Sequence, residues 1–390
     1  MRLLHTADWH LGRTLEGRSR LEEQEQFLDE LCEIVEREKI DAVLMAGDVF
    51  DTVNPPARAE QLFYDSMARL SDNGRRPVIV IAGNHDNPDR LSASSPLAQK
   101  HGITLVGYPI EQMIKLPVPT SGELLNVAAL PYPSEARLKT VLSEENEELL
   151  LRETYDAQIR GIFDKLCHSF TNDTVNVAMS HIFTAGGSST ESERPIEVGG
   201  AYTVRATSLP AKAQYTALGH LHRPQNIKNA LAPARYSGSP LAFSFSEANY
   251  TKSVTIVDVK PGGQAQLEEI YLSSGRPLVS WKALNGMQEV YQWLAEGRDH
   301  NAWIDLEIHV ENALSIEEIH RLRKQHDGLI HIRPIFPEME AEMNDTPKRN
   351  IPIDEMFKIF YKRQTGGGVP EPELVELFLK IIQDDDREEE

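Results

Sequence analysis

Side chains that can bind metal ions recur between residues 8 and 222, each directly after a short apolar run of strand type. They are Asp8, His10, Asp48, Asn84, His85, His181, His220 and His222. Open α/β sheets place their sites at the carboxyl ends of strands, so we expect these side chains to meet at one edge. Carboxylate, imidazole and amide groups without a thiolate suit a divalent ion such as Mn, Fe or Zn. The pattern therefore predicts a metal site.

Each short pattern also has an ordinary structural explanation. Gly47-Asp48 could be a turn with a helix-capping aspartate, and His181 alone could be a core histidine. Asp8 and His10 are two residues apart, so they point to one side only if the extended backbone continues beyond the first strand. The joint occurrence of the patterns in this order is what favours a metal site.

The candidate ligands are too many for one ion with an open coordination position. Two ions that share a bridging carboxylate would use nearly all of them. Such a pair, about 3.5 to 4 Å apart, activates a water and holds the attacking and leaving oxygens of a displacement at phosphorus. The sequence therefore predicts phosphoester hydrolysis.

The elements that position these residues are short apolar strands separated by segments with helical spacing. The predicted strands are 3–6, 42–46, 78–82, 103–106, 127–130, 175–180, 215–218 and 253–257, with helical faces over 21–35 and 62–70. Strand, helix, strand units at this spacing favour an α/β fold with a parallel sheet covered on both faces.

A chain of 390 residues is longer than a single hydrophobic core supports. We expect a catalytic domain over 1–275, a small α+β domain over 276–337, a polar linker over 338–350 and a helical segment with an acidic tail over 351–390. In the last segment Met356, Phe360, Leu374 and Leu377 repeat at helical spacing, which indicates an apolar surface for a partner. The alternative is that both helices pack back on their own domain.

The overall composition narrows the class of protein. The net charge of −20 argues against coating nucleic acid by bulk electrostatics, but it leaves room for a locally basic groove. The sequence contains only Cys32 and Cys167, no charged and apolar leader, and no apolar run of membrane length, so we expect a reducing cytoplasm. No P-loop pattern occurs, so any ATP dependence must come from a partner.

Five blocks resemble those of the calcineurin-like metallophosphoesterases. They are Asp8-Trp9-His10, Gly47-Asp48, Gly83-Asn84-His85-Asp86, His181 and Gly219-His220-Leu221-His222. More narrowly, residues 5–12, 46–52 and 236–241 are similar to nuclease subunits of double-strand-break repair complexes, over about residues 1–275. The resemblance implies a β-sheet core covered by helices, a small α+β capping domain that binds DNA, and a helical tail that binds an ATPase.

The resemblance also implies roles for individual residues. Asp8, His10, Asp48 and His222 would hold one Mn ion, and Asp48, Asn84, His181 and His220 the other, with Mg or another divalent ion possible. Asp48 is then the bridge, and His85 would stabilise charge at the scissile phosphate. Arg13, Arg18 and Arg20 are the nearest cations for a DNA backbone, unless they are simply solvated loop residues.

One position departs from the pattern of distant relatives, which carry a histidine three residues beyond the bridging aspartate. Here that residue is Asp51. We predict that its carboxylate pairs with the His85 imidazole as a catalytic dyad; the alternative is that Asp51 caps the helix before Pro55.

The resemblance implies a double-strand exonuclease acting from 3′ ends, with endonuclease activity on single strands and hairpins, in DNA end processing, replication and recombination. It further implies a homodimer through helices near 55–70, a heterotetramer with the ATPase, and a place in the cytoplasm at the nucleoid. Two alternatives remain: a phosphatase or phosphodiesterase of a small nucleotide, and a non-catalytic scaffold that binds DNA ends.

Overall fold

The computed structural model describes residues 1–134, 137, 148–193, 202–336 and 353–364, and in the tail 370–372, 374, 375 and 377–379. The chain divides into two compact units, Met1–Val279 and Ser280–Glu390. The predicted linker 338–350 and the acidic end of the tail lie outside the described residues.

The first unit contains two six-stranded sheets. The first sheet has the order β16 (Gln266–Tyr271), β15 (Ser253–Asp258), β1 (Arg2–Thr6), β4 (Ala42–Ala46), β5 (Val78–Ile81) and β6 (Ile103–Val106). Strands β1, β4, β5 and β6 are parallel, whereas β15 pairs antiparallel with both β1 and β16. The parallel strands are continuous apolar runs because both of their faces are buried.

The second sheet has the order β13 (Gln225–Asn226), β14 (Ala234–Tyr236), β12 (Tyr215–Gly219), β9 (Val175–His181), β8 (Leu124–Leu130) and β7 (Ile114–Pro117). Its four inner strands are parallel, and the two edge strands β13 and β7 are antiparallel to their neighbours. Short pairs also form between β2 (Thr14–Leu15) and β3 (Arg18–Ser19), and between β10 (Phe183–Thr184) and β11 (Thr203–Val204).

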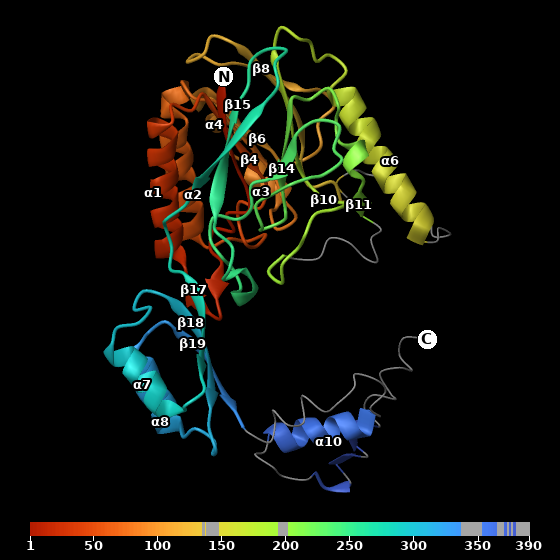
Figure 1. The fold of residues 1–390 in the computed structure, drawn as a ribbon. Coiled ribbons are helices and arrows are strands. Elements are labelled where there is room, and N and C mark those ends of the chain that lie inside the picture. Colours follow the sequence, from red (N-terminus) through yellow and green to blue (C-terminus); the bar gives the residue numbers. More distant parts are fainter. Residues whose placement is uncertain are drawn as a thin grey trace. The chain divides into compact units, whose positions relative to one another are not determined.

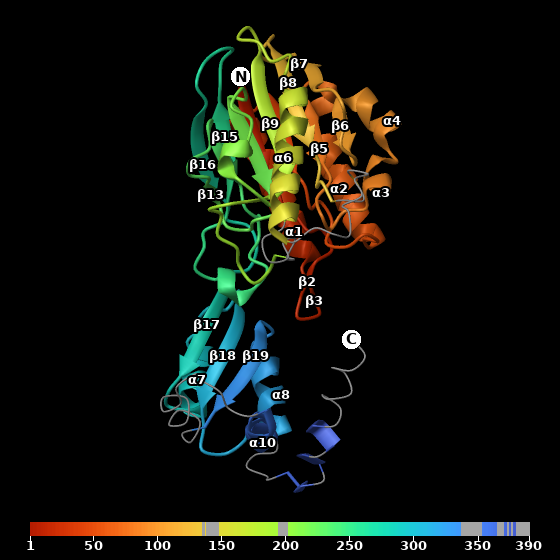
Figure 2. The same cartoon turned by 90° about the vertical axis from the view of Figure 1, so that its right-hand side faces the viewer.

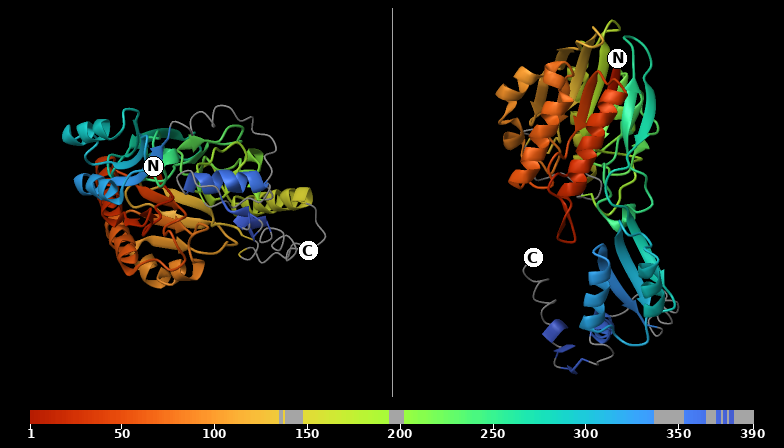
Figure 3. Two further views of the ribbon diagram at one scale, coloured as in Figure 1. Left: turned by 90° about the horizontal axis from the view of Figure 1, so that it is seen from below. Right: turned by 90° about the vertical axis from the view of Figure 1, so that its left-hand side faces the viewer.

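Helices cover the outer face of each sheet. They are α1 (Leu21–Arg37), α2 (Ala57–Leu70), α3 (Pro88–Ser92), α4 (Ser95–Ala98) and α6 (Glu148–Leu166). Figures 1 and 3 show α1 and α2 on one flank of this unit and α6 on the opposite flank. Figure 2 looks from the α6 side, with α6 in front of the strands.

Alternation along the strands explains these layers. In β4, Val43 and Met45 pack in the same cluster as α1 and α2, whereas Leu44 packs with Val177 of the second sheet. Ala178 of β9 faces away and packs with Ile159 of α6. The expected α/β fold with sheets covered on both faces is therefore confirmed: each sheet has one face covered by helices and one face against the other sheet. The division of the strands into two sheets was not predicted.

The second unit contains a three-stranded sheet in the order β17 (Leu278–Ala283), β18 (Trp303–His309) and β19 (Leu329–Ile335), with helices α7 (Met287–Ala295), α8 (Ile316–Gln325) and α10 (Ile353–Gln364). Helix α8 begins with a capping box between Ser315 and Glu318. Trp281, Val290 and Leu322 are fully buried and belong to a strand and two helices of this unit. Among the described helices, none is long and apolar enough to cross a membrane.

Candidate metal centre

Five of the seven predicted ligands lie in two groups of facing side chains at the ends of strands of both sheets. Ligand atoms of Asp8, His10 and His222 lie within 4.8 Å of one another, as do those of Asp8, Asp48 and His181. The first group follows β1 and β12, and the second follows β1, β4 and β9. The two sheets therefore meet at this edge, and neither sheet alone could build the site.

The backbone beyond β1 does not stay extended, so the condition under which Asp8 and His10 would point to one side of a strand is not met, although their ligand atoms still lie within 4.8 Å of each other. Both residues are left-handed, with φ of 56° and 45°, and so is Asp48 at 50°. Asp8 N–H donates to the Gly47 carbonyl and His10 N–H to the Asp48 carbonyl, both at 3.0 Å. Left-handed backbone at non-glycine residues costs about 1 to 3 kcal/mol each and is typical of functional sites.

The Asp48 carboxylate lies between the two groups. Its Oδ2 is 3.6 Å from His10 Nε2 and 3.4 Å from His181 Nε2. His181 Nε2 is also 2.9 Å from Asn84 Oδ1. His220 completes this side, since its ring centroid lies 5.4 Å from that of His181. This is the placement that a bridging carboxylate needs, with one set of nitrogen and oxygen atoms on each side.

The side chains fit divalent ions better than they fit one another. His10 Nε2 and His222 Nε2 are only 3.1 Å apart and both rings are buried. Asp8 Oδ2 is buried without a hydrogen-bond partner among the described residues. An unpaired buried carboxylate oxygen is costly unless a cation is bound beside it, and the two facing imidazole nitrogens are close enough to bind one cation together.

Burial and mutual charge set the protonation of these groups. Burial lowers the pKa of His10 to about 3, so its imidazole is neutral, as a metal ligand must be. Burial, together with the Asp48 charge, holds the pKa of Asp8 well above its usual range. Burial acts against charge on His181 as well, but the carboxylates of Asp48 and Asp8 raise its pKa to about 9. Asp8 and Asp48 are therefore two buried acids close together, and both depend on the same nearby positive charge.

Glycine is required where the loops pass closest to one another. A Cβ atom at Gly83 would lie 2.0 Å from Asp48 Oδ1, and one at Gly219 would lie 1.8 Å from the Ala46 carbonyl oxygen. No side chain fits at either distance. The loops after β4, β5 and β12, which carry candidate ligands, thus pass close to one another at glycine residues.

Two supporting residues had no role in the interpretation of the sequence. The Asp86 carboxylate is buried and accepts from the N–H groups of Val49, Phe50 and Gly83 at 3.1, 2.9 and 2.8 Å, so it joins the Asp48 loop to the Asn84 loop. Burial and the Asp48 charge raise its pKa to about 6. Arg137 donates to the carbonyls of Gly83 and Asp86 at 2.8 and 2.7 Å. In the sequence, the position of Asp86 directly after His85 could have indicated its role, whereas no sequence feature indicated a role for Arg137.

His85 and Asp51 lie together at the half-exposed side of the site, but not as the predicted dyad. His85 Nδ1 is 2.7 Å from the main-chain carbonyl oxygen of Asp51. The Asp51 carboxylate faces His10 Nδ1 at 3.4 Å and Arg13 at 3.6 Å instead. Ligand atoms of His10, Asp51 and His85 still lie within 4.8 Å of one another, so the Asp51 carboxylate is near His85 without a hydrogen bond between the two side chains in the described structure.

The three arginines differ in their surroundings. Arg13 is half-buried, donates to the Ser192 carbonyl at 3.0 Å and lies over the Phe243 ring, next to Asp51. Arg18 is half-buried on the short β2–β3 hairpin. Arg20 is buried, and its guanidinium makes two hydrogen bonds to Glu23 and one to the Ala242 carbonyl. Arg20 is thus a structural residue, and the expectation that it contacts DNA is wrong.

Comparisons with known proteins agree with this geometry. The calcineurin-like phosphoesterase family model matches residues 1–224. The chain is 64% identical over 381 residues, 98% of its length and 97% of the relative's, to the D subunit of the SbcCD nuclease of Bacillus subtilis. It is 31% identical over 260 residues, 67% of its length and 66% of the relative's, to the D subunit of the SbcCD nuclease of Staphylococcus epidermidis.

The family match and the nearly full-length relative indicate the same family as the five sequence blocks that form the site. Members of the calcineurin-like phosphoesterases bind divalent metal ions, and the grouped carboxylates and imidazoles are suited to that task. The chain belongs to the calcineurin-like phosphoesterase family and, within it, to the SbcD nucleases, the D subunits of SbcCD complexes.

Proposed function

We propose that this chain is a metal-dependent DNA phosphodiesterase that works as the nuclease subunit of an SbcCD-type complex with an SbcC ATPase. The observation that carries the proposal is the position of the Asp48 carboxylate between two groups of ligand atoms. The relatives' names supply the substrate class. Two Mn ions are the proposed occupants, with Asp8, His10, Asp48 and His222 around one and Asp48, Asn84, His181 and His220 around the other.

The ions would supply a Lewis acid and an activated water at phosphorus. The residues of the chain orient the substrate around them. Asn84, His85, Asp51 and Arg13 are half-exposed whereas Asp8, His10, Asp48 and His181 are buried, so a phosphate reaches the site from the His85 side. His85 Nδ1 donates to the Asp51 carbonyl, which leaves Nε2 as the nitrogen that can offer a proton to a phosphate oxygen or the leaving 3′ oxygen.

Arg13 is the proposed contact for the DNA backbone beside the site. Its guanidinium is held by Phe243, Asp51 and the Ser192 carbonyl, so it is oriented before DNA arrives. Arg18, on the hairpin that follows, is proposed as a further contact. The two cations Arg13 and Arg18 can contact phosphates although the chain has a net negative charge, because salt screens the more distant acidic residues.

The tail is the proposed binding segment for SbcC. Met356 and Phe360 of α10 are 54% and 56% exposed, and Leu377 is 54% exposed. Phe357 stacks on Phe378 with ring centroids 4.1 Å apart, which joins the two tail segments into one apolar surface. Removing residues 345–390 should leave metal-dependent cleavage intact but abolish co-purification with SbcC, and a complex that survives the truncation would contradict this assignment.

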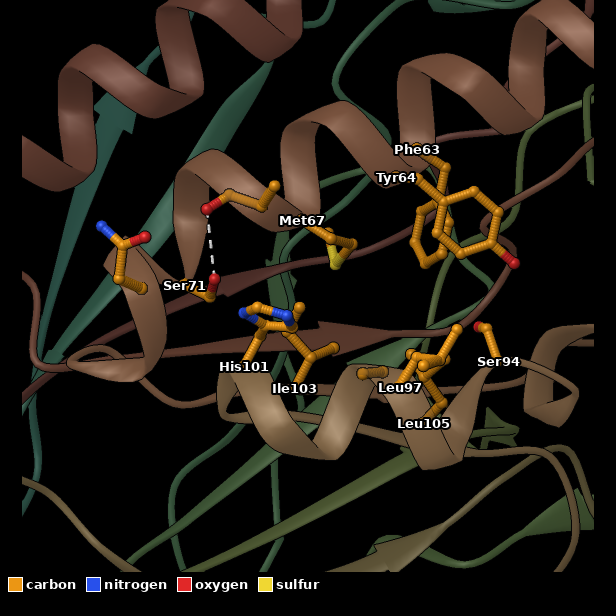
Figure 4. A pocket seen from close by; sticks show the side chains of 12 residues that line it. Phe63, Tyr64, Met67, Ser71, Ser94, Leu97, His101, Ile103 and Leu105 are labelled. Carbon is orange, nitrogen blue, oxygen red and sulfur yellow. Dashed lines mark hydrogen bonds between the residues drawn. The ribbon is translucent and has the colours of Figure 1, made fainter.

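A homodimer is proposed through the outer face of α2 and α4. A groove of about 590 Å³ lies there, lined by Phe63, Tyr64, Met67, Leu97 and Leu105 among others (Figure 4). Leu97 is 69% exposed, which is unusual for a leucine beside other apolar side chains. The substitution Leu97→Glu should convert a dimer of the isolated chain to a monomer by light scattering, whereas Leu231→Glu, at another exposed leucine, should not.

The full proposal includes exonuclease action from 3′ ends, endonuclease action on single strands and hairpins, and a role in replication and recombination at the nucleoid in the cytoplasm. Metal-stripped protein given Mn, Mg or Zn and assayed on end-labelled duplex, hairpin DNA and a chromogenic phosphodiester tests it. Cleavage of both DNA substrates is expected. Turnover of only the small phosphodiester would favour a small-nucleotide enzyme, and DNA binding without any turnover would favour a scaffold.

A further inference from the structure

A buried chain of polar groups lies behind His222, on the side of the ring away from His10. Ser192 Oγ is 2.6 Å from His222 Nδ1 and 2.5 Å from Glu247 Oε1. Ser192 is 7% exposed and Glu247 is fully buried. The other Glu247 oxygen is paired with Lys252, whose ammonium also donates to Ser239 Oγ and the His222 carbonyl. A buried acid, base, hydroxyl and imidazole are thus connected in one network.

The direction of the hydrogen bonds follows from the donors available. Glu247 is a carboxylate, because its second oxygen is paired with the Lys252 ammonium inside the protein. The carboxylate can only accept, so the Ser192 hydroxyl donates to it. Ser192 Oγ then accepts from His222 Nδ1–H. The proton on Nδ1 leaves the Nε2 lone pair on the side of His10 Nε2, 3.1 Å away.

Ser192 is needed because Glu247 alone is too far away. His222 Nδ1 and Glu247 Oε1 are 3.7 Å apart, which is beyond hydrogen-bond distance. The His181 ring is held differently: its Nδ1 donates directly to the Ala46 carbonyl at 2.9 Å. The next residue, Glu193, accepts from the His222 main-chain N–H at 2.8 Å. Residues 192 and 193 therefore hold both the ring and the backbone of His222.

We propose that Ser192 is a positioning residue for His222. The Ser192 hydroxyl connects the Glu247 carboxylate to the imidazole by a relay of hydrogen bonds and so directs Nε2 toward one of the two ion sites. The inference rests on the proposed function, in which His222 is a ligand of one ion and His181 of the other. Groups that accept from the distal nitrogen of a ligating histidine typically contribute about 10- to 100-fold in metal affinity. The relay should therefore act on one ion and leave the second unaffected.

Calorimetric titration of metal-stripped protein with Mn tests the relay. Ser192→Ala should weaken one of the two binding events about 10- to 100-fold and leave the other within twofold. Ser192→Thr keeps the hydroxyl and should restore most of the affinity. Ser189→Ala is the matched control, since Ser189 is an exposed serine of the same loop, and it should bind like wild type. DNA cleavage by Ser192→Ala should be lost at limiting Mn and recovered at saturating Mn.

The possible outcomes separate the relay from the proposed function. Two unchanged Mn affinities in Ser192→Ala, beside a wild-type protein that binds two ions and cleaves DNA, would overturn the relay alone. A wild-type protein that binds no divalent ion would overturn the proposed function. If Ser192→Ala does not fold, Glu247→Gln keeps the shape of the acceptor and removes its charge; a selective loss at the same ion supports the relay, and unchanged affinities overturn it.

Discussion

Removal of the Asp86 carboxylate should destabilise the first unit strongly, because that side chain holds two ligand-bearing loops together. Asp86→Ala leaves the N–H groups of Val49, Phe50 and Gly83 without their acceptor. Each unsatisfied buried donor costs about 1 to 3 kcal/mol, and entry of water lowers the sum to about 3 to 5 kcal/mol. Asp86→Asn keeps one acceptor oxygen, so its loss should be about half as large.

Unfolding in guanidinium, monitored by tryptophan fluorescence, measures the difference in free energy of unfolding between the wild type and each variant, since Trp9 lies in the core of the same unit. Asp89→Ala is the matched control, because Asp89 is exposed and its carboxylate accepts from the Tyr108 hydroxyl. It should cost less than about 1 kcal/mol. If Asp86→Ala unfolds at the same denaturant concentration as Asp89→Ala, the carboxylate does not hold the loops and the reasoning fails.

Two further predictions concern catalysis and pH. His85→Gln should keep its metal stoichiometry by elemental analysis but cleave labelled DNA about 10² to 10⁴ times more slowly, and wild-type rates would exclude His85 from the chemistry. Burial of Glu30 is outweighed by hydrogen bonds from Ser273 and Ser274, so its folded pKa is depressed. Its carboxylate therefore stabilises the fold above the unfolded pKa of about 4.3 and loses that effect as pH falls through the folded pKa. Glu30→Gln should cost about 1 kcal/mol at pH 7, after allowance for solvent screening, and the cost should shrink in melts as the pH falls below about 4 and vanish below the folded pKa. A pH-independent difference would contradict this assignment.

Periodicity and residue type were enough to place the strands that end at the site. Apolar runs such as Val78–Ile81 are strands because both faces are buried, and the ligands follow them directly. The second sheet was not predicted as a separate layer, because strand runs carry no information on which sheet they join. Which sheet a strand joins depends on packing between residues distant in sequence, such as Leu44 and Val177 in one buried cluster.

Side-chain direction within the site was beyond the reach of sequence. Asp and His adopt left-handed backbone more readily than most residues, but the left-handed turns at Asp8, His10 and Asp48 lie where loops from different strands pass close together, such as Gly83 against Asp48, and those approaches are not visible in the sequence. The same turns direct the Asp51 carboxylate to His10 and Arg13 and not to His85. Arg20 was misread for a similar reason, since Glu23 lies one helical turn away and pairs with it inside the protein.

We propose that the Asp48 carboxylate lies between two divalent ions, and the proposed chemistry depends on that position. Mn stoichiometry of the wild type and of Asp48→Asn, measured by calorimetry and elemental analysis on the same preparations, tests it most directly. We expect two ions per chain in the wild type and reduced occupancy at both sites in Asp48→Asn, because two cations would face each other with less compensating charge. Two tightly bound Mn ions in Asp48→Asn would contradict the bridging position.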